Sequence, residues 1–187
     1  GRNVHPGSAK RCMINAQLIA MEFHGMLPVH DRPEATEGYE GFSHLCAMQG
    51  EVELATLEYI IRDHDRASFE ARKALFESAA AFLNAKYGAG TVEVALRDSY
   101  YNMREKIEPH MAIVEAAQQA MRDAGVTPRV VPIRGGTDGA RLSYEGLPCP
   151  NLFTGGENYL GRFEYVPVED MEAAVRTLKC ILRNAAK

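Results

Sequence analysis

The chain has 187 residues, 25 of them acidic and 21 basic, so its formal net charge at neutral pH is −4. This length fits one large domain or two small ones. With 46% hydrophobic and 25% charged residues, the composition is typical of a globular protein and excludes a disordered tail or a low-complexity scaffold. The negative net charge gives no overall attraction to nucleic acid or to anionic lipid, so neither is expected as a partner.

The lengths of the apolar runs and the spacing of the cysteines exclude further classes of protein. Every apolar run is interrupted before the roughly 20 residues that a bilayer span needs, so no membrane span is predicted. The four cysteines lie far apart and form no Cys-x-x-Cys pair (Cys12, Cys46, Cys149 and Cys180). This spacing indicates neither a structural zinc site nor a redox dithiol. We expect buried free thiols in a reducing cytoplasm.

The first half of the chain predicts the order helix, strand, strand, helix, strand. Ser8 is a suitable N-cap, and the apolar residues after it recur at helical spacing, which predicts a helix over about 9–24. Residues 42–50 and 54–62 predict two strands. In the second strand, alternation places four apolar side chains on one face: Ala55, Leu57, Tyr59 and Ile61.

A long amphipathic helix is predicted over about 66–86, with a buried stripe of Phe69, Phe76, Ala80 and Leu83. A glycine turn then leads into a strand over 92–97, in which Val92, Val94 and Leu96 face inward. One more strand before residue 1 would complete a ferredoxin-like βαββαβ unit. We therefore expect the chain to be a piece of a longer protein.

The second half shows a different pattern. A helix that ends near Gly125 is followed by short strands over 129–133 and 151–153, each running into a glycine turn, and by a final amphipathic helix. Such repeats are typical of an α/β layer. The predicted fold class is mixed α+β and α/β, with two domains: an incomplete ferredoxin-like domain over 1–106 and an α/β part over 107–187.

The glycine-rich turn Arg134–Gly139 is the first candidate for chemistry. Its adjacent glycines, Gly135 and Gly136, allow a ligand to approach the backbone closely, and Thr137 and Asp138 can cap the following helix. An exposed helix N-terminus attracts anions. A turn and a capped helix alone also explain this pattern.

Two side chains in the first half are further candidates. His5 lies in a turn before a helix, where a neutral imidazole can donate a hydrogen bond to a developing oxyanion, or where it is simply a surface residue. Arg62 ends a strand and is followed by two aspartates. It forms either a surface ion pair, worth about 0–1 kcal/mol, or a bidentate clamp for a substrate carboxylate.

Six strings, in order along nearly the whole chain, resemble the peptidase T family of two-zinc metallopeptidases: Asn3–Gly7, Glu37–Phe42, Tyr59–Asp63, Asp98–Glu105, Arg134–Gly139 and Leu147–Gly156. The resemblance implies a cytoplasmic hydrolase that removes the N-terminal residue from tripeptides. It also implies that 1–106 is the lid or dimerisation domain without its first strand. Residues 107–187 would then be the C-terminal part of the catalytic domain.

The resemblance assigns roles residue by residue. His5 matches a lid histidine that helps bind the scissile carbonyl, often in the partner subunit's site, and Arg62 matches an arginine that holds the C-terminal carboxylate of the tripeptide. Asn102 lies in a matching string. The substrate-side loop is matched by Arg134, Gly135, Gly136, Thr137 and Asp138.

One departure affects the metal site. The family reads Asn-Tyr-His-Gly where this chain reads Asn158-Tyr159-Leu160-Gly161, and the leucine has no lone pair with which to bind zinc. We therefore expect no catalytic residue and no complete two-zinc site in this chain, and no activity from it alone. A homodimer through the lid is expected. The alternative is a non-catalytic dimerisation or ligand-binding α/β module.

Overall fold

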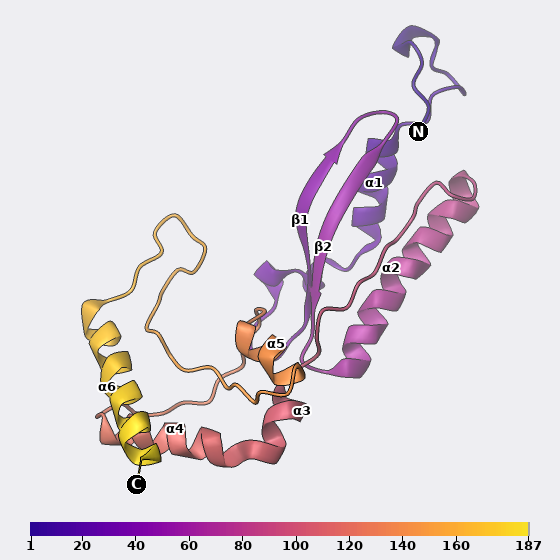
Figure 1. The fold of residues 1–187 in the computed structure, drawn as a ribbon. Coiled ribbons are helices and arrows are strands. Elements are labelled where there is room, and N and C mark those ends of the chain that lie inside the picture. The colour runs from indigo at the N-terminus through magenta and orange to yellow at the C-terminus, as the bar shows by residue number, and fades with distance from the viewer. Residues whose placement is uncertain (187) are drawn as a thin grey trace. The chain divides into compact units, whose positions relative to one another are not determined.

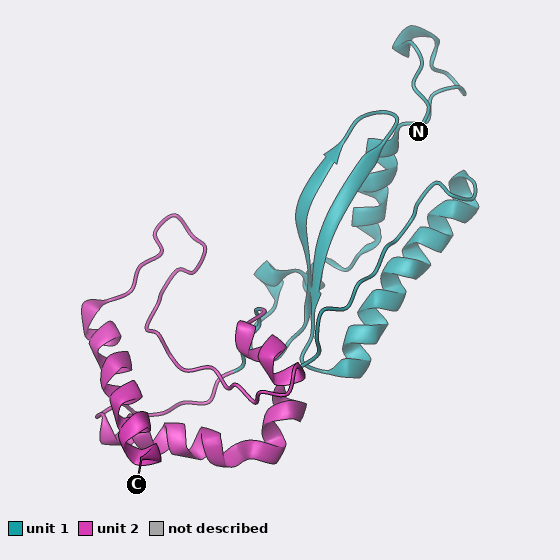
Figure 2. Cartoon of the chain, viewed as in Figure 1, with its two compact units in different colours: residues 1–102, 132–135 teal, residues 103–131, 136–187 magenta. Residues whose placement is uncertain are grey.

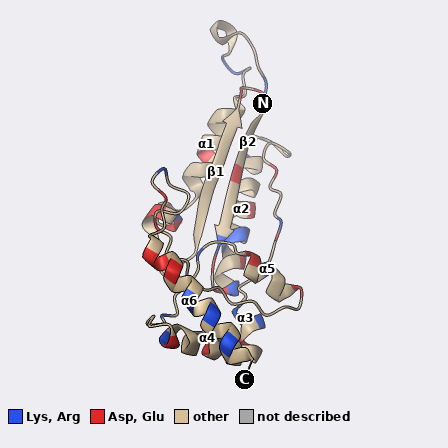
Figure 3. Cartoon of the chain, turned by 60° about the vertical axis from the view of Figure 1, so that its left-hand side comes forward, with Lys and Arg blue, Asp and Glu red and all other residues tan. Residues whose placement is uncertain are grey.

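The computed structural model describes residues 1–186. The chain divides into two compact units, as Figure 2 shows. Unit 1 consists of residues 1–102 and 132–135, and unit 2 consists of residues 103–131 and 136–187. In both units acidic and basic residues are interspersed along the ribbon (Figure 3). Among the described helices, none is long and apolar enough to cross a lipid bilayer.

Unit 1 is built on an antiparallel hairpin of β1 (Phe42–Gly50) and β2 (Ala55–Arg62). Helices α1 (Ala16–Met26) and α2 (Arg66–Tyr87) lie beside it (Figure 1). The register pairs Phe42 with Arg62 at one end of the hairpin and Gly50 with Ala55 at the other, with an irregularity between Leu45 and Ala47. Both predicted strands are confirmed, because each had a sequence neighbour with which to form a ladder.

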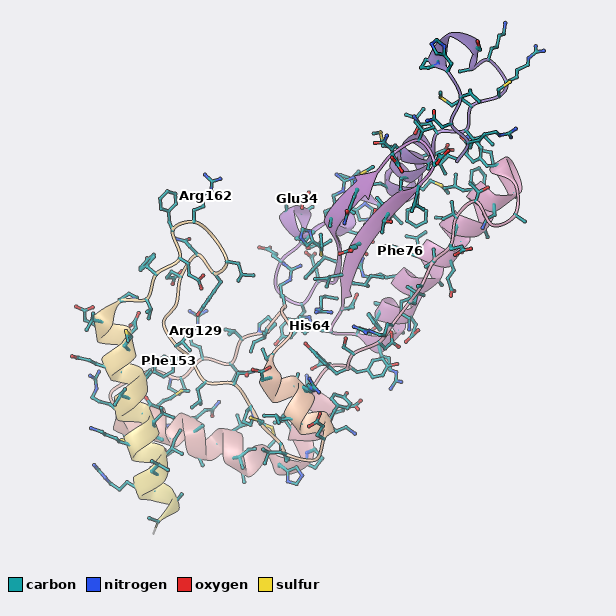
Figure 4. The ribbon with its side chains drawn as sticks, turned by 45° about the horizontal axis from the view of Figure 1, so that its top comes forward. Glu34, His64, Phe76, Arg129, Phe153 and Arg162 are labelled. Carbon is teal, nitrogen blue, oxygen red and sulfur yellow. The ribbon has the colours of Figure 1, made fainter. Side chains whose placement is uncertain are left out.

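The core of unit 1 lies between this hairpin and the two helices. Phe76, which is labelled in Figure 4, belongs to this core. Its ring meets Tyr59 edge-on at 4.9 Å and Phe23 at 5.8 Å. The buried members are Ile19, Phe23, Leu27, Phe76, Ala79, Ala80 and Leu83. The stripe predicted for α2 is thus confirmed in three of its four positions. Phe69 is half-buried and contacts the Tyr101 ring instead.

The first helix begins later than predicted. α1 starts at Ala16, where the side chain of Asn15 accepts a hydrogen bond from the Gln17 N–H at 2.9 Å, so Asn15 and not Ser8 is its cap. Pro6–Ser8 forms only a short 3-10 helix. The chain between them bends back, because Arg2 pairs with Ile14 as an antiparallel bridge and Arg11 has a φ of 63°. Neither feature is compatible with a continuous helix.

The strand predicted over 92–97 is not formed. Val92 and Val94 do pack against the core as expected, while Leu96 is 38% exposed. The N–H and C=O of Val92 bond to the side chain of Asn84, each at 2.8 Å. Within the described residues β2 pairs with β1 alone. The segment therefore has no neighbouring strand, and a strand is defined by its ladder to a neighbour.

Unit 2 is helical, with α3 (Arg104–Ile107), α4 (Met111–Asp123), α5 (Asp138–Tyr144) and α6 (Val168–Ala185). Helices α4 and α6 pack together, burying Ala120 and Thr177, and Asn184 donates to Asp123 at 2.9 Å. The strands predicted over 129–133 and 151–153 are absent from the described structure, because no partner strand lies beside them.

The environment of the cysteines also differs from the prediction. All four are free, as expected, but Cys12 and Cys46 are exposed and the other two, Cys149 and Cys180, are only half-buried. The expected burial was wrong because it rested on the usual behaviour of free cysteine and not on the place of each cysteine in the fold. Cys46 lies at the irregularity in β1, where the alternation of faces is interrupted.

Candidate functional site

Three predicted site residues meet at one end of the hairpin of unit 1. Arg62 stands opposite Phe42 in the sheet register, and the guanidinium carbon of Arg134 lies 4.9 Å from the centre of the Phe42 ring. Asn102 donates from its side-chain amide to the carbonyl of His64 at 3.2 Å. These contacts define what we call the hairpin-end cluster: Phe42, Arg62, His64, Asn102 and Arg134.

Arg62 forms no ion pair with a carboxylate among residues 1–186, and its guanidinium has few protein partners. The bond recorded for its guanidinium runs from Nη1 to the carbonyl of the preceding Ile61, at 3.3 Å. The adjacent Asp63 is taken by another arginine, since its Oδ2 lies 3.0 Å from Nε of Arg72. The surface ion pair considered from the sequence is therefore not formed by Arg62, and its remaining N–H groups are available to a ligand.

The guanidinium of Arg134, unlike that of Arg62, binds several groups of the protein. Its guanidinium donates to the carbonyl of Thr36 at 2.7 Å, to the carbonyl of Glu40 at 3.2 Å and to the Thr36 hydroxyl, while Nε is buried without a partner among the described atoms. The side chain thereby fastens residues 132–135 to the loop that precedes β1. In this structure it organises the protein, and its predicted contact with substrate remains a prediction.

His64 is the member of the cluster that sequence reasoning missed. Its Nδ1 lies 3.3 Å from the carbonyl oxygen of Tyr39, and its Nε2 lies 3.2 Å from that of Ile133. The rings of Tyr39 and His64 meet edge-on at 5.2 Å. The only local signal is its position between Asp63 and Asp65, directly after β2. The contact with Ile133, 69 residues away, leaves no trace in the sequence pattern.

His5 lies at the other end of the hairpin. Its Nδ1 accepts a hydrogen bond from the Gly7 N–H at 3.1 Å, and nearby Gly1 donates from its ammonium to the carbonyl of Glu53 at 2.6 Å. Glu53 belongs to the turn between β1 and β2. An eight-residue strand separates that turn from Arg62 by about 25 Å at the usual rise per residue. His5 and Arg62 are therefore not brought together within one copy of unit 1.

The glycine-rich turn continues into unit 2, where it starts α5. The Thr137 side chain accepts from the Ala140 N–H at 3.1 Å and so caps this helix, which has seven residues. Gly139 is needed for close packing: a Cβ there would lie 2.5 Å from the carbonyl oxygen of Cys149. Asn151 donates to the Thr137 hydroxyl at 3.2 Å. These contacts account for the capping and the packing of the turn, and the predicted substrate contact of residues 134–138 remains a prediction.

The residues present do not fit a zinc centre. Within residues 1–186, no group of three or more His, Cys, Asp or Glu side chains is placed to hold a metal ion. Leu160, at the family's histidine position, is 97% exposed and has a φ of 61°. A positive φ is uncommon for leucine, whereas histidine, asparagine and aspartate adopt it more readily.

A cavity of about 220 Å³ lies elsewhere in unit 1, between α1, β1, β2 and α2, and includes His24, Arg32 and Tyr59. Arg32 donates to Nε2 of His24 at 3.1 Å, and Nδ1 of His24 lies 2.9 Å from the Tyr59 hydroxyl. Burial raises the pKa of Tyr59 to about 12. The side chains of His24, Arg32 and Tyr59 thus satisfy one another.

The comparisons with known proteins agree with the strings found in the sequence. Residues 1–91 match the family model described as a peptidase dimerisation domain. The chain is 54% identical to a peptidase T of Alkaliphilus oremlandii and 58% identical to one of Clostridium perfringens, in both cases over all 187 residues. It spans 46% of the length of each of these curated relatives.

Two crystal structures share the fold. A tripeptidase from Staphylococcus aureus matches with a TM-score of 0.65 and 21% identity, over 95% of this chain and 47% of that one. The aminopeptidase PepT from Bacillus cereus matches with a TM-score of 0.62 and 20% identity, over 98% and 49%. The mixed α/β fold class predicted from the sequence is confirmed. The predicted resemblance is confirmed too: over its whole length the chain is similar to about half of a peptidase T, and it begins with a match to the peptidase dimerisation domain.

Proposed function

We propose that the chain is the substrate-holding part of a tripeptide aminopeptidase, a hydrolase that removes the N-terminal residue from tripeptides in the cytoplasm. The observation that carries this proposal is the uncommitted guanidinium of Arg62 at the hairpin end, in a chain 54–58% identical to peptidase T proteins. Neighbouring Arg72 and Arg134 are occupied by protein groups.

In the proposed role, Arg62 binds the C-terminal carboxylate of the peptide. A guanidinium offers two parallel N–H donors that match the two carboxylate oxygens. Because one end of the peptide is held at a fixed point, the length of the peptide decides whether it is a substrate. A dipeptide then falls short of the reacting groups, and a tetrapeptide overruns them.

The chain supplies no step of bond cleavage in this proposal. Its described residues form no zinc site, and Leu160 offers no donor atom. The described residues therefore do not fit the zinc ions that the family resemblance implies. We propose instead that this chain contributes the carboxylate anchor and a homodimer surface, and that it turns over no tripeptide by itself.

The carboxylate anchor can be tested by calorimetric binding of trialanine to the 187-residue chain. Arg62→Ala should weaken binding by about 10-fold or more, because a hydrogen bond to a charged group contributes about 1.5–3 kcal/mol. Trialanine amide, which lacks the carboxylate, should bind the original chain and Arg62→Ala equally weakly. Arg129→Ala, which removes an exposed arginine of unit 2, is the control and should bind like the original chain.

Two results would count against the proposal. An equal loss for trialanine and its amide would contradict the anchor role of Arg62. If no tripeptide binds but the chain sediments as a dimer, the non-catalytic dimerisation module is the better description. That alternative is favoured by the match of residues 1–91 to a peptidase dimerisation domain.

A further inference from the structure

The contacts of His64 lead to an inference that does not depend on the proposed function. The ring bridges two segments far apart in sequence, with Nδ1 at 3.3 Å from the carbonyl oxygen of Tyr39 and Nε2 at 3.2 Å from that of Ile133. Tyr39 lies in the loop before β1, and Ile133 lies in the 132–135 segment of unit 1. We call this arrangement the histidine bridge.

Both partners of the ring are hydrogen-bond acceptors. A backbone carbonyl has no proton to donate, so each of the two contacts needs an N–H on the imidazole side. A neutral imidazole carries one N–H, and only the imidazolium carries two. The histidine bridge is therefore complete only when His64 holds a proton on both ring nitrogens. We propose that protonated His64 is a positioning residue that fastens residues 132–135 to the loop before β1.

The same reasoning gives the opposite result for His24, which serves as an internal comparison. Arg32 can only donate, so Nε2 of His24 must accept and carries no proton. The Nδ1 atom then holds the single proton and donates it to the Tyr59 oxygen. His64 and His24 thus differ in protonation. The Nε2 atom of His64 faces a carbonyl, whereas the Nε2 atom of His24 faces a guanidinium.

Several of the charged groups around His64 are engaged with other partners. Asp63 pairs with Arg72 at 3.0 Å, and Asp65 accepts from the Ser68 N–H at 2.8 Å. Arg134 is bound to the Thr36 and Glu40 carbonyls. The other titratable or charged residues on the segments that meet at His64 are Glu37, Tyr39, Glu40, Arg62, Arg66, Asp98 and Tyr101. Of these, Asp98 pairs with Lys73, and Arg66 lies over the Tyr101 ring.

Loss of one proton would open one side of the histidine bridge. Arg134 would still hold the segment through Thr36 and Glu40, so the fold of unit 1 should persist. The residues that gain freedom are Ile133 and its neighbours, up to the glycine pair that follows Arg134. The protonation of the ring should therefore control how firmly that turn is held.

Solution NMR of the 187-residue chain, with carbon-13 and nitrogen-15 labels, tests the histidine bridge. At pH 5.5 both ring nitrogens of His64 should carry a proton, whereas His24 should carry one, on Nδ1. The carbonyl carbon signals of Tyr39 and Ile133 should move together with the His64 ring as the pH rises to 8. His64→Phe should abolish both carbonyl titrations, and His30→Phe, which removes an exposed histidine, should leave them unchanged.

Two outcomes would overturn the inference. One is a His64 ring with a single proton at pH 5.5 in the original chain, a measurement that does not depend on any variant folding. The other is a carbonyl titration at Ile133 that survives in His64→Phe. Neither outcome bears on whether Arg62 binds a tripeptide, so the histidine bridge and the proposed function can fail separately.

Discussion

Asp65 holds the first turn of α2, the helix that carries most of the core of unit 1. Its Oδ1 accepts from the Ser68 N–H at 2.8 Å. The pKa of Asp65 is lowered, chiefly by the backbone hydrogen bond from Ser68, with a smaller contribution from the backbone of Ala67. A carboxylate at a helix N-terminus also interacts favourably with the helix dipole. The charged form of this one side chain therefore favours the folded state.

Asp65→Ala should lower the melting temperature of the chain by a few degrees near neutral pH, as loss of an N-cap does. The folded-state pKa lies below the unfolded one, so the carboxylate's contribution is complete above the ordinary aspartate value of about 3.9. It is lost as the pH falls through the lowered folded value. The difference between Asp65→Ala and the original chain should shrink on acidification, as thermal melts at several pH values would show. Asp65→Asn keeps a capping oxygen and should lie between the two; a gap that widens in acid would contradict this account.

The elements show where sequence reasoning succeeds and where it stops. Helix α2 and strands β1 and β2 were predicted closely, because caps, periodicity and alternation are local. The strands predicted over 92–97, 129–133 and 151–153 are not formed. A strand needs a neighbouring strand, and the residues of these segments do not specify one. At the hairpin end, Arg62 could be chosen from its place at the end of a strand. The role of His64 depends on carbonyls 25 and 69 residues away, and no local pattern encodes such a pairing.

Helix α6 shows the same limit of sequence reasoning, because the sequence does not tell which face of this helix is buried. The predicted amphipathic helix is formed, but three residues of its apolar stripe are not buried. Val175, Leu178 and Leu182 are 50%, 49% and 72% exposed. Helix α6 packs against α4, and its most deeply buried residue is Thr177, which is 1% exposed. Among the described residues the Thr177 hydroxyl has no hydrogen-bond partner. A buried hydroxyl without a partner loses its hydration and gains nothing in return.

Thr177→Val should therefore raise the free energy of unfolding of unit 2 by about 1 kcal/mol. It replaces an unsatisfied hydroxyl with a methyl group of similar shape, and threonine and valine have similar helix propensities. Urea unfolding, followed residue by residue with hydrogen exchange, would measure the change. Thr127→Val, at an exposed position of the same unit, should have no such effect. A loss of stability in Thr177→Val would mean that the hydroxyl has a partner, such as a bound water.

Over the whole molecule, buried apolar side chains are distributed unevenly between the units. The main core cluster lies entirely in unit 1 and includes two phenylalanines and three larger aliphatic residues. Among the described residues of unit 2, the buried apolar residues are Ile107, Ala120 and Ala140. Burial of apolar area contributes roughly 25 cal/mol per Å², and alanine offers little of it. Unit 2 therefore keeps most of its larger apolar side chains, including the stripe on α6, in contact with solvent.

We expect the 187-residue chain to unfold in two steps, with unit 2 first. Peptides from α4 and α6 should lose protection from hydrogen exchange at a lower urea concentration than peptides from α1 and α2, because unit 1 has more buried apolar area to lose. Residues 132–135 should follow unit 1, since Arg134 fastens them to Thr36 and Glu40. Arg134→Lys, which keeps the charge but removes the fork of donors, should release this segment early and leave the two main steps in place.

A single transition, in which peptides of both units lose protection together, would show that the units stabilise each other and would refute the expected order. Stabilisation of unit 2 alone at rising chain concentration would show that copies of the chain associate through unit 2, because association stabilises by mass action only the unit whose folded surface it covers.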